Sequence, residues 1–260
     1  MEKGEVKSLI GMPIVLLIGL GLAFVGSEDS YKVFDGLPLF GLVVALAFII
    51  QWIAFVPAFI FKTEKFYDLT GSITYITITI LAVFLSPELD TRSLVILILV
   101  LIWAVRLGSF LFIRVMKRGE DDRFAKIKQS FITFLLTWSL QGLWVSFTLA
   151  AALGAITTSS KTDFGIIGIL GVLIWIIGFA FEAIADYQKN KFRSVPENKG
   201  KFIHTGLWSI SRHPNYFGEI TLWIGIAIIA IPNLSGIGYL TLISPVFVFL
   251  LIYKISFNIG

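Results

Sequence analysis

The sequence predicts an all-α protein, a polytopic bundle of seven to eight transmembrane helices that forms one integral membrane domain over residues 1–260. Two observations predict this class. Hydrophobic residues make up 57% of the chain and charged residues only 15%, a composition well outside that of soluble domains. Apolar runs close to the roughly 20 residues that cross a bilayer as a helix also recur along the whole chain.

These runs predict the individual membrane spans. The first run lacks a small-residue cleavage site and further runs follow it, so we interpret it as a retained helix and not as a signal peptide. The third and seventh runs are short, which leaves seven spans as an alternative to eight. The eight candidate spans cover residues 8–26, 36–61, 72–86, 93–113, 130–156, 164–186, 216–231 and 238–256.

The distribution of Lys and Arg predicts the orientation of the bundle. With a cytoplasmic N-terminus, eight spans place 17 of the 21 cations on the cytoplasmic side, three on the other side, and Arg106 inside a span. We therefore expect both termini on the cytoplasmic side. The membrane is expected to be a bacterial inner membrane or that of the endoplasmic reticulum. Residues 114–129 and 187–215 carry 12 of these cations, which topology explains as well as ligand binding does.

Two acidic residues stand at the cytoplasmic end of the sixth run. Glu182 and Asp186 are four positions apart, so a helix places them on one face, just before the cations Lys189 and Arg193. Salt bridges explain this pattern. Cofactor binding explains it equally well, because the acids can accept hydrogen bonds from ribose or adenine while the cations hold phosphates.

The stretch "SRHPNYFGE", residues 211–219, predicts a helix start. Pro214 suits the first helical position, and Ser211 or His213 could cap the helix. The positive end of the helix dipole and the guanidinium of Arg212 make this start an anion site.

Asn215 and Glu219 are also four positions apart and are expected to face one interior cavity. His204 is the only other histidine besides His213, and the chain has no cysteine, so we expect no multi-His or Cys-ligated metal site.

A few polar residues lie within the apolar runs. Gln51 and Arg106 could be interhelical contacts, the commoner use, or donors that polarise a lipid carbonyl. Tyr67 lies beside Asp68 and is either a proton donor or an ordinary interfacial anchor. The glycines at 165, 168 and 171 are interpreted as helix-packing residues, and no dinucleotide or nucleotide-binding glycine motif is present.

Four stretches together resemble the membrane steroid 5α-reductase-like family, which includes bacterial relatives. They are "TEKFYDLTGSITY" (63–75), "RVMKRGEDDRF" (114–124), "FEAIADYQKNKFR" (181–193) and "GLWSISRHPNYFGEITLW" (206–223), and the resemblance covers about residues 45–250. It implies a helical bundle that binds NADPH on its cytoplasmic side. The implied reaction reduces a carbon–carbon double bond conjugated to a carbonyl in a steroid-like or other lipid. We expect no nucleic-acid partner.

The resemblance also implies roles for individual residues. Asp186 and Arg193 would contact the ribose, adenine and phosphates, and Asn215 with Glu219 would contact the nicotinamide. Apart from the resemblance, the residues themselves make Gln51, Tyr67 and Arg106 the catalytic candidates, and Gln51, Trp52 and Trp223 the candidates for substrate contact. The whole implied cofactor site comprises Arg114, Lys117, Arg118, Asp122, Asp186, Lys189, Arg193, Lys201, Arg212, His213, Asn215, Tyr216 and Glu219.

Departures from the family pattern keep other functions open. Gln51 is followed by Trp52 where the family has a Gln-Glu pair, and Arg106 stands where a Tyr is expected. The chain ends at "KISFNIG", whereas relatives continue into a polar tail. Isoprenylcysteine-type methyltransferases, which use S-adenosylmethionine, share an Arg-His-Pro motif, so a methyltransferase and a noncatalytic lipid-binding protein are the alternatives.

Overall fold

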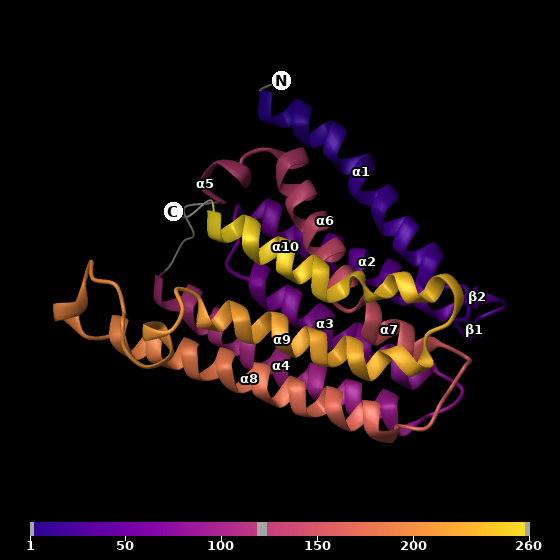
Figure 1. The fold of residues 1–260 in the computed structure, drawn as a ribbon. Coiled ribbons are helices and arrows are strands. Elements are labelled where there is room, and N and C mark those ends of the chain that lie inside the picture. Colours follow the sequence, from indigo (N-terminus) through magenta and orange to yellow (C-terminus); the bar gives the residue numbers. More distant parts are fainter. Residues whose placement is uncertain (1–2, 119–123, 258–260) are drawn as a thin grey trace.

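The computed structural model describes residues 3–118 and 124–257, and it is a helical bundle with one two-stranded hairpin (Figure 1). In these residues, eight helical segments are long and apolar enough to cross a membrane. This finding confirms the all-α polytopic fold and favours eight spans over seven. It gives no orientation, so the cytoplasmic placement of the termini stays a prediction.

Most connections between the elements are short, but residues 194–213, between α8 and α9, form a long one that contains the 3₁₀ segments Pro196–Asn198 and Gly206–Ser209. Two of the eight candidate spans are completed by 3₁₀ segments, at Ile231–Asn233 and Gly236–Leu242. The helices are α1 Lys3–Gly26, α2 Leu39–Ile60, α3 Tyr67–Leu85, α4 Thr91–Arg118, α5 Phe124–Ile127, α6 Phe131–Thr148, α7 Ala150–Thr157, α8 Gly165–Arg193, α9 Pro214–Ala230 and α10 Ile243–Phe257, and the hairpin strands are β1 Lys32–Val33 and β2 Leu37–Pro38.

Several boundaries differ from the sequence prediction, among them the start of α1 at Lys3 and not at 8 and the end of α4 at Arg118 and not at 113. Helix α3 begins at Tyr67 and not at 72, because the hydroxyls of Thr70 and Ser72 bond to carbonyls one turn earlier and so fit a helix. The predicted span 130–156 is divided into α6 and α7 at Leu149. Helix α8 continues to Arg193, so the first cations of the predicted 187–215 loop are helical.

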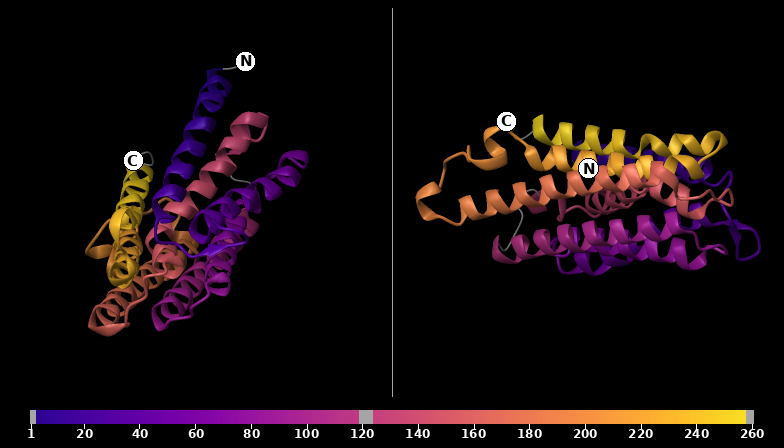
Figure 2. Two further views of the ribbon diagram at one scale, coloured as in Figure 1. Left: turned by 90° about the vertical axis from the view of Figure 1, so that its right-hand side faces the viewer. Right: turned by 60° about the horizontal axis from the view of Figure 1, so that its bottom comes forward.

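The helices form two groups joined by α7. On one side of the bundle α3 packs against both α2 and α4, on the other side α9 packs against both α8 and α10 (Figure 2), and α6 packs against α1 and α2. Helix α7 lies between them, and all of its residues are buried because alanine and glycine let its neighbours approach closely. The two groups meet through an edge-to-face contact between Trp103 on α4 and Trp223 on α9, with ring centroids 4.9 Å apart.

Helices α8 and α9 run antiparallel in close contact along their lengths. Glycines make this approach possible. A side chain added at Gly178 would lie 2.7 Å from the Gly218 carbonyl, and one at Gly225 would lie 2.7 Å from the Gly171 carbonyl. Gly171 is thus a packing residue as predicted, but Gly165 is not, since it starts α8 at a φ of 54° with open space beside it.

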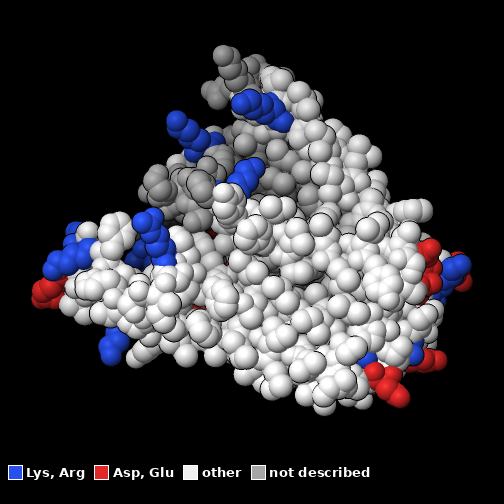
Figure 3. Space-filling model, viewed as in Figure 1, with Lys and Arg blue, Asp and Glu red and all other residues white. Residues whose placement is uncertain are grey.

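The two ends of the bundle differ in charge. The basic end is defined here by the α2–α3 turn at 61–66, α5, the last turns of α8 and the connection 194–213, where cations gather (Figure 3). The acidic end is defined by the connections 27–38, 86–90, 158–164 and 233–236; the first three together carry six acidic residues and two lysines, and 233–236 carries no charge. At this end Arg92 is fully buried and donates to Asn233 Oδ1 (3.1 Å) and to the Ile229 carbonyl (2.5 Å).

Candidate active site

The candidate site is built around Arg106, which lies on α4 towards the basic end. Its guanidinium bridges two carboxylates of α8: Nη1 is 2.7 Å from Oε1 of Glu182, and Nη2 pairs with Oδ2 of Asp186. Glu182 and Asp186 share one helix face, as their spacing predicts, and both are buried. Such a buried bridge fixes the positions of all three side chains.

The first turn of α9 completes this cluster. Pro214 occupies the first position of α9, as predicted, and Asn215 next to it donates a 3.2 Å hydrogen bond from Nδ2 to Oδ1 of Asp186. Glu219 follows one turn later and lines the same cavity as Asn215. The glycine contacts between α8 and α9 bring these residues together from positions far apart in the sequence.

A cavity of about 510 Å³ opens between α4, α8 and α9 beside this cluster. One wall is apolar and comes from α4, with Leu107, Phe110 and Leu111. The opposite wall carries Glu182, Asp186, Asn215, Tyr216 and Glu219, and the cations Arg114, Lys189 and Arg193 also line the cavity. We call it the Arg106 cavity.

Several buried polar atoms near this cavity have no hydrogen-bond partner within residues 3–118 and 124–257. They include the acceptor Oδ1 of Asn215 and the indole N–H donor of Trp223, whereas the Trp103 indole N–H lies next to the Glu182 carboxylate and interacts with it. Buried polar atoms are nearly always satisfied in folded proteins. A bound ligand with both donors and acceptors would satisfy them.

His213 lies at the start of α9 but does not cap it. Its side chain makes no capping hydrogen bond, and neither does Ser211, whose hydroxyl oxygen accepts from the His213 backbone N–H. The predicted capping roles are therefore wrong, and the imidazole stacks on Tyr216 with centroids 4.7 Å apart. Burial, with the charges of Lys189 and Arg212, lowers the pKa of His213 below its ordinary value of 6.5.

The structure does not bring the predicted residues of α2 and early α3 into the Arg106 cavity. Gln51 is fully buried and donates from Nε2 to Thr74 Oγ1 (2.7 Å), while the Tyr67 hydroxyl donates to the Thr137 carbonyl (3.0 Å). The Trp52 indole donates to Ser139. These contacts join α2, α3 and α6, and roles for Gln51, Trp52 and Tyr67 in the reaction stay predictions.

The other predicted cofactor residues have mixed placements. Arg114, Lys189 and Arg193 line the cavity together with Tyr216, whereas Lys201 and Arg212 are exposed on the connection between α8 and α9. The side chains of Lys117 and Arg118, and all of Asp122, lie outside the described residues. Trp223 is buried against Trp103.

Two features of the site were missed by sequence reasoning. Glu182 was noted for its spacing from Asp186, but its ion pair with Arg106, 76 positions away, has no local signal. The apolar wall of Leu107, Phe110 and Leu111 also has none, because these residues resemble any other lipid-facing part of a span.

The sequence matches one family model over most of its length and several curated proteins over shorter stretches. Residues 54–258 match the model of a family described as "Protein of unknown function (DUF1295)". A probable 7-dehydrocholesterol reductase of Acanthamoeba polyphaga mimivirus is 29% identical over 109 residues, 34% of this chain and 23% of the relative. A Delta(14)-sterol reductase of Ascobolus immersus is 34% identical over 80 residues, 25% of this chain and 18% of the relative.

A third relative carries a different activity in its name. The probable O-methyltransferase ustE of Ustilaginoidea virens is 38% identical over 53 residues, 20% of this chain and 18% of the relative. The chain thus spans less than a quarter of the length of each of these three curated relatives. No solved structure matches the chain.

Proposed function

The chain belongs to DUF1295, a steroid 5α-reductase-like family, and on this basis we propose that it is a membrane reductase that uses NADPH. The substrate would be a sterol-like or other lipid, and the reaction would reduce a carbon–carbon double bond that is conjugated to a carbonyl. The observation that carries the proposal is the Arg106 cavity, where a fixed carboxylate cluster, an unpartnered acceptor and cations meet between helices.

The residues of this cavity fit a phosphate-bearing dinucleotide. Arg114, Lys189 and Arg193 would hold the phosphates, because guanidinium and ammonium groups bind phosphate oxygens strongly. The unpartnered Oδ1 of Asn215 would accept a hydrogen bond from an amide or hydroxyl donor of the cofactor. When bound, NADPH supplies a hydride.

The chain's own groups would orient both partners of the reaction. Arg106 holds Glu182 and Asp186 in place, so that Asp186 in turn fixes Asn215 at the start of α9. The apolar wall of α4 would exclude water from the cavity and contact the lipid.

The substrate carbonyl needs a donor that is already in position. Trp103 stands three residues before Arg106 on α4, and Trp223 stands four residues after Glu219 on α9, so both lie one turn away from the cluster. The Trp103 N–H interacts with the Glu182 carboxylate, whereas the unpartnered N–H of Trp223 is suited to stabilise negative charge that develops on a carbonyl oxygen. On this proposal the lipid's polar end would lie between α4 and α9.

A methyltransferase is the second candidate, because the relative of Ustilaginoidea virens bears that activity in its name. Its cofactor, S-adenosylmethionine, carries a sulfonium cation and no phosphate. The three cations that line the Arg106 cavity suit several phosphates better. Both sterol relatives are named as reductases, which also supports the first proposal.

Thermal unfolding of the detergent-purified protein separates these candidates. A ligand that binds only the folded state stabilises it by about 2.7 kcal/mol at a concentration of 100 times its Kd. We expect NADPH to raise the unfolding temperature and S-adenosylmethionine to leave it unchanged. No shift with saturating NADPH would refute the proposal, and a shift without loss of nicotinamide absorbance on adding enone lipids would favour a noncatalytic lipid-binding protein.

A further inference from the structure

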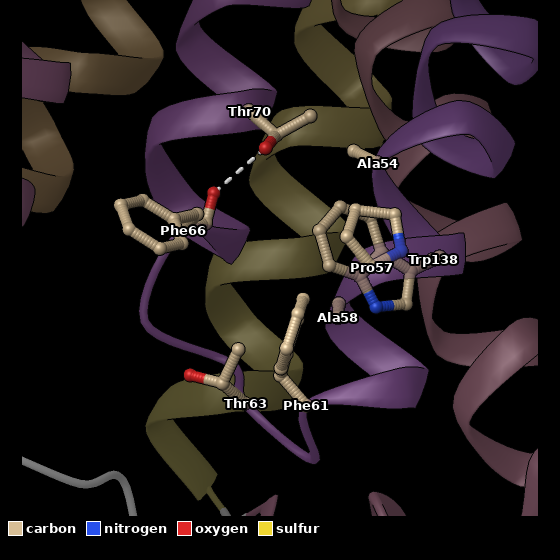
Figure 4. A pocket seen from close by; sticks show the side chains of 8 residues that line it. All are labelled: Ala54, Pro57, Ala58, Phe61, Thr63, Phe66, Thr70 and Trp138. Atoms are coloured by element: carbon tan, nitrogen blue, oxygen red, sulfur yellow. Dashed lines mark hydrogen bonds between the residues drawn. The ribbon is translucent and has the colours of Figure 1, made fainter.

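A second cavity, of about 360 Å³, lies between α2, α3 and α6 and shares no lining residue with the Arg106 cavity (Figure 4). Its volume is within the roughly 300–1,000 Å³ of small-molecule sites. Figure 4 shows Phe61 and Thr63 at one end of this space and Ala54 and Thr70 at the other. We call it the Trp138 cavity, after the α6 residue that forms part of its wall.

The cavity exists because α2 presents small side chains here. Ala54 and Ala58 line it from α2, so this helix leaves space that larger residues would fill. Phe61 and Phe66 stand at the α2–α3 turn, and their side chains are 75% and 53% exposed. The cavity therefore lies beside the surface at the basic end of the bundle, where a lipid of that leaflet can enter.

An apolar cavity of this kind cannot select a lipid by its hydrocarbon chain alone. Lipid tails are as apolar as its wall, so moving a tail from the bilayer into it changes the free energy little. Selectivity must come from polar groups of the wall or the mouth. The Thr70 hydroxyl is already occupied, because it donates to the Phe66 carbonyl at 2.8 Å.

Trp138 supplies a polar group that is not occupied. Its side chain is 1% exposed, and its indole N–H has no partner in the described part of the chain. Water is scarce at membrane depth, so an unpaired donor there is costly. A ligand of this cavity should therefore carry an acceptor oxygen next to its hydrocarbon chain.

The mouth of the cavity adds positive charge. Lys62 and Lys65 lie on the turn between Phe61 and Phe66, and Lys65 is exposed. Trp138 packs edge-on against Tyr67, the first residue of α3, with centroids 5.2 Å apart. The unpaired donor is thus close to the helix ends, at the level where the ester groups of a phospholipid lie below its headgroup.

We propose that the Trp138 cavity binds one acyl chain of an anionic, ester-linked phospholipid from the leaflet at the basic end. An ester carbonyl accepts the hydrogen bond of the Trp138 indole, and Lys62 and Lys65 attract the headgroup. This site is separate from the Arg106 cavity, so the inference does not depend on the proposed reductase activity.

Native mass spectrometry of the full chain in mild detergent tests this site. The probes are dioleoyl phosphatidylglycerol, its ether-linked analogue without ester carbonyls, and dioleoyl phosphatidylcholine. We expect the wild type to prefer the ester over the ether form, and phosphatidylglycerol over phosphatidylcholine, each by about fivefold, the effect of one hydrogen bond or one nearby cation.

Paired variants separate the two contacts. Trp138→Phe keeps the ring and removes the N–H, so it should abolish the ester preference and keep the headgroup preference. The double variant Lys62→Gln/Lys65→Gln should do the reverse. Ala54→Leu should fill the cavity and abolish both, whereas Ala45→Leu, at an exposed position of the same helix, should change neither.

Three outcomes would overturn the proposal. They are equal binding of the ester and ether lipids by the wild type, an unchanged ester preference in Trp138→Phe, and displacement of phosphatidylglycerol by an enone sterol, which would assign the cavity to a sterol. An unaltered unfolding temperature of each variant in lipid-free detergent establishes that it is folded. Failure of the reductase proposal would leave all these measurements possible, because none of them uses NADPH.

Discussion

The side-chain amide of Asn215 donates a 3.2 Å hydrogen bond to Asp186 and so joins the first turn of α9 to the end of α8. The other amide atom, Oδ1, is buried and has no partner in the described residues. One side chain therefore positions the wall of the Arg106 cavity and also offers an acceptor to a ligand.

Asn215→Ala should weaken NADPH binding by about ten- to a hundredfold, the usual effect of losing hydrogen bonds that involve charged partners. The substitution removes both the contact to Asp186 and the free acceptor. Isothermal titration or NADPH-dependent thermal shifts measure the change. Lys7→Ala, at an exposed position of α1, is the control, and a similar loss in both variants would contradict the assignment of Asn215 to the cavity.

Arg193→Ala should weaken NADPH binding by at least about tenfold, because it removes a guanidinium that lines the cavity. Lys191→Ala is a matched control. Lys191 is an exposed cation two residues earlier on the same helix and is absent from the cavity lining. Binding measured at several salt concentrations should show a shallower salt dependence for Arg193→Ala only, and equal effects would mean that general basic charge and not the cavity attracts the cofactor.

Much of this architecture is present as local patterns in the sequence. Continuous apolar runs indicate the eight spans, Pro214 marks the start of α9, and the spacing of Glu182 and Asp186 puts both on one face. The seven-residue spacing of Gly171 and Gly178 is the local sign of the close α8–α9 contact. Each signal comes from residues within one continuous segment of the chain.

The remaining features depend on pairs that are distant in sequence. Arg106 meets Glu182 across 76 positions and Arg92 meets Asn233 across 141, and no periodicity encodes either contact. Arg92 lies just outside the predicted span 93–113, yet it is fully buried. The apolar wall of the Arg106 cavity and the small α2 residues of the Trp138 cavity likewise cannot be distinguished from lipid-facing residues by composition.

Gly178→Ala should destabilise the protein and weaken NADPH binding together. The added Cβ would lie 2.4 Å from the Leu222 backbone nitrogen, so α8 and α9 must move apart. Overpacking of this kind costs about 1–3 kcal/mol, which corresponds to roughly 2–4 °C of unfolding temperature per kcal/mol in a chain of this size. Gly21→Ala is the control, since a Cβ there meets nothing within 4 Å, and an equal effect of both variants would contradict the packing argument.

Arg92→Leu should lower the stability without changing the NADPH affinity. Its guanidinium also donates to the Asp163 carbonyl (2.6 Å), and losing these hydrogen bonds at the acidic end costs about 3 kcal/mol or more. Chemical denaturation measures the loss, with Lys32→Leu as the exposed control at the same end. A lost NADPH affinity at temperatures where Arg92→Leu is fully folded would show that the two ends of the bundle are coupled.

Acidification should weaken the stability of the protein alone and strengthen its binding of NADPH, both through His213. Burial and the charges of Lys189 and Arg212 hold the pKa of His213 below its unfolded value, so the unfolded state takes up the proton first. The contribution of His213 to stability is thus fully present above about pH 6.5 and is lost as the pH falls from there towards the lower folded pKa.

Protonation of His213 also adds a cation next to Tyr216, which lines the Arg106 cavity, and this charge favours the anionic cofactor. Unfolding temperatures with and without NADPH, measured from about pH 7.5 to about pH 5.5 across the histidine range, should diverge in the wild type and in His204→Gln. In His213→Gln the NADPH-induced shift should increase less on acidification than in the wild type, and an unchanged profile would assign the pH dependence to another group.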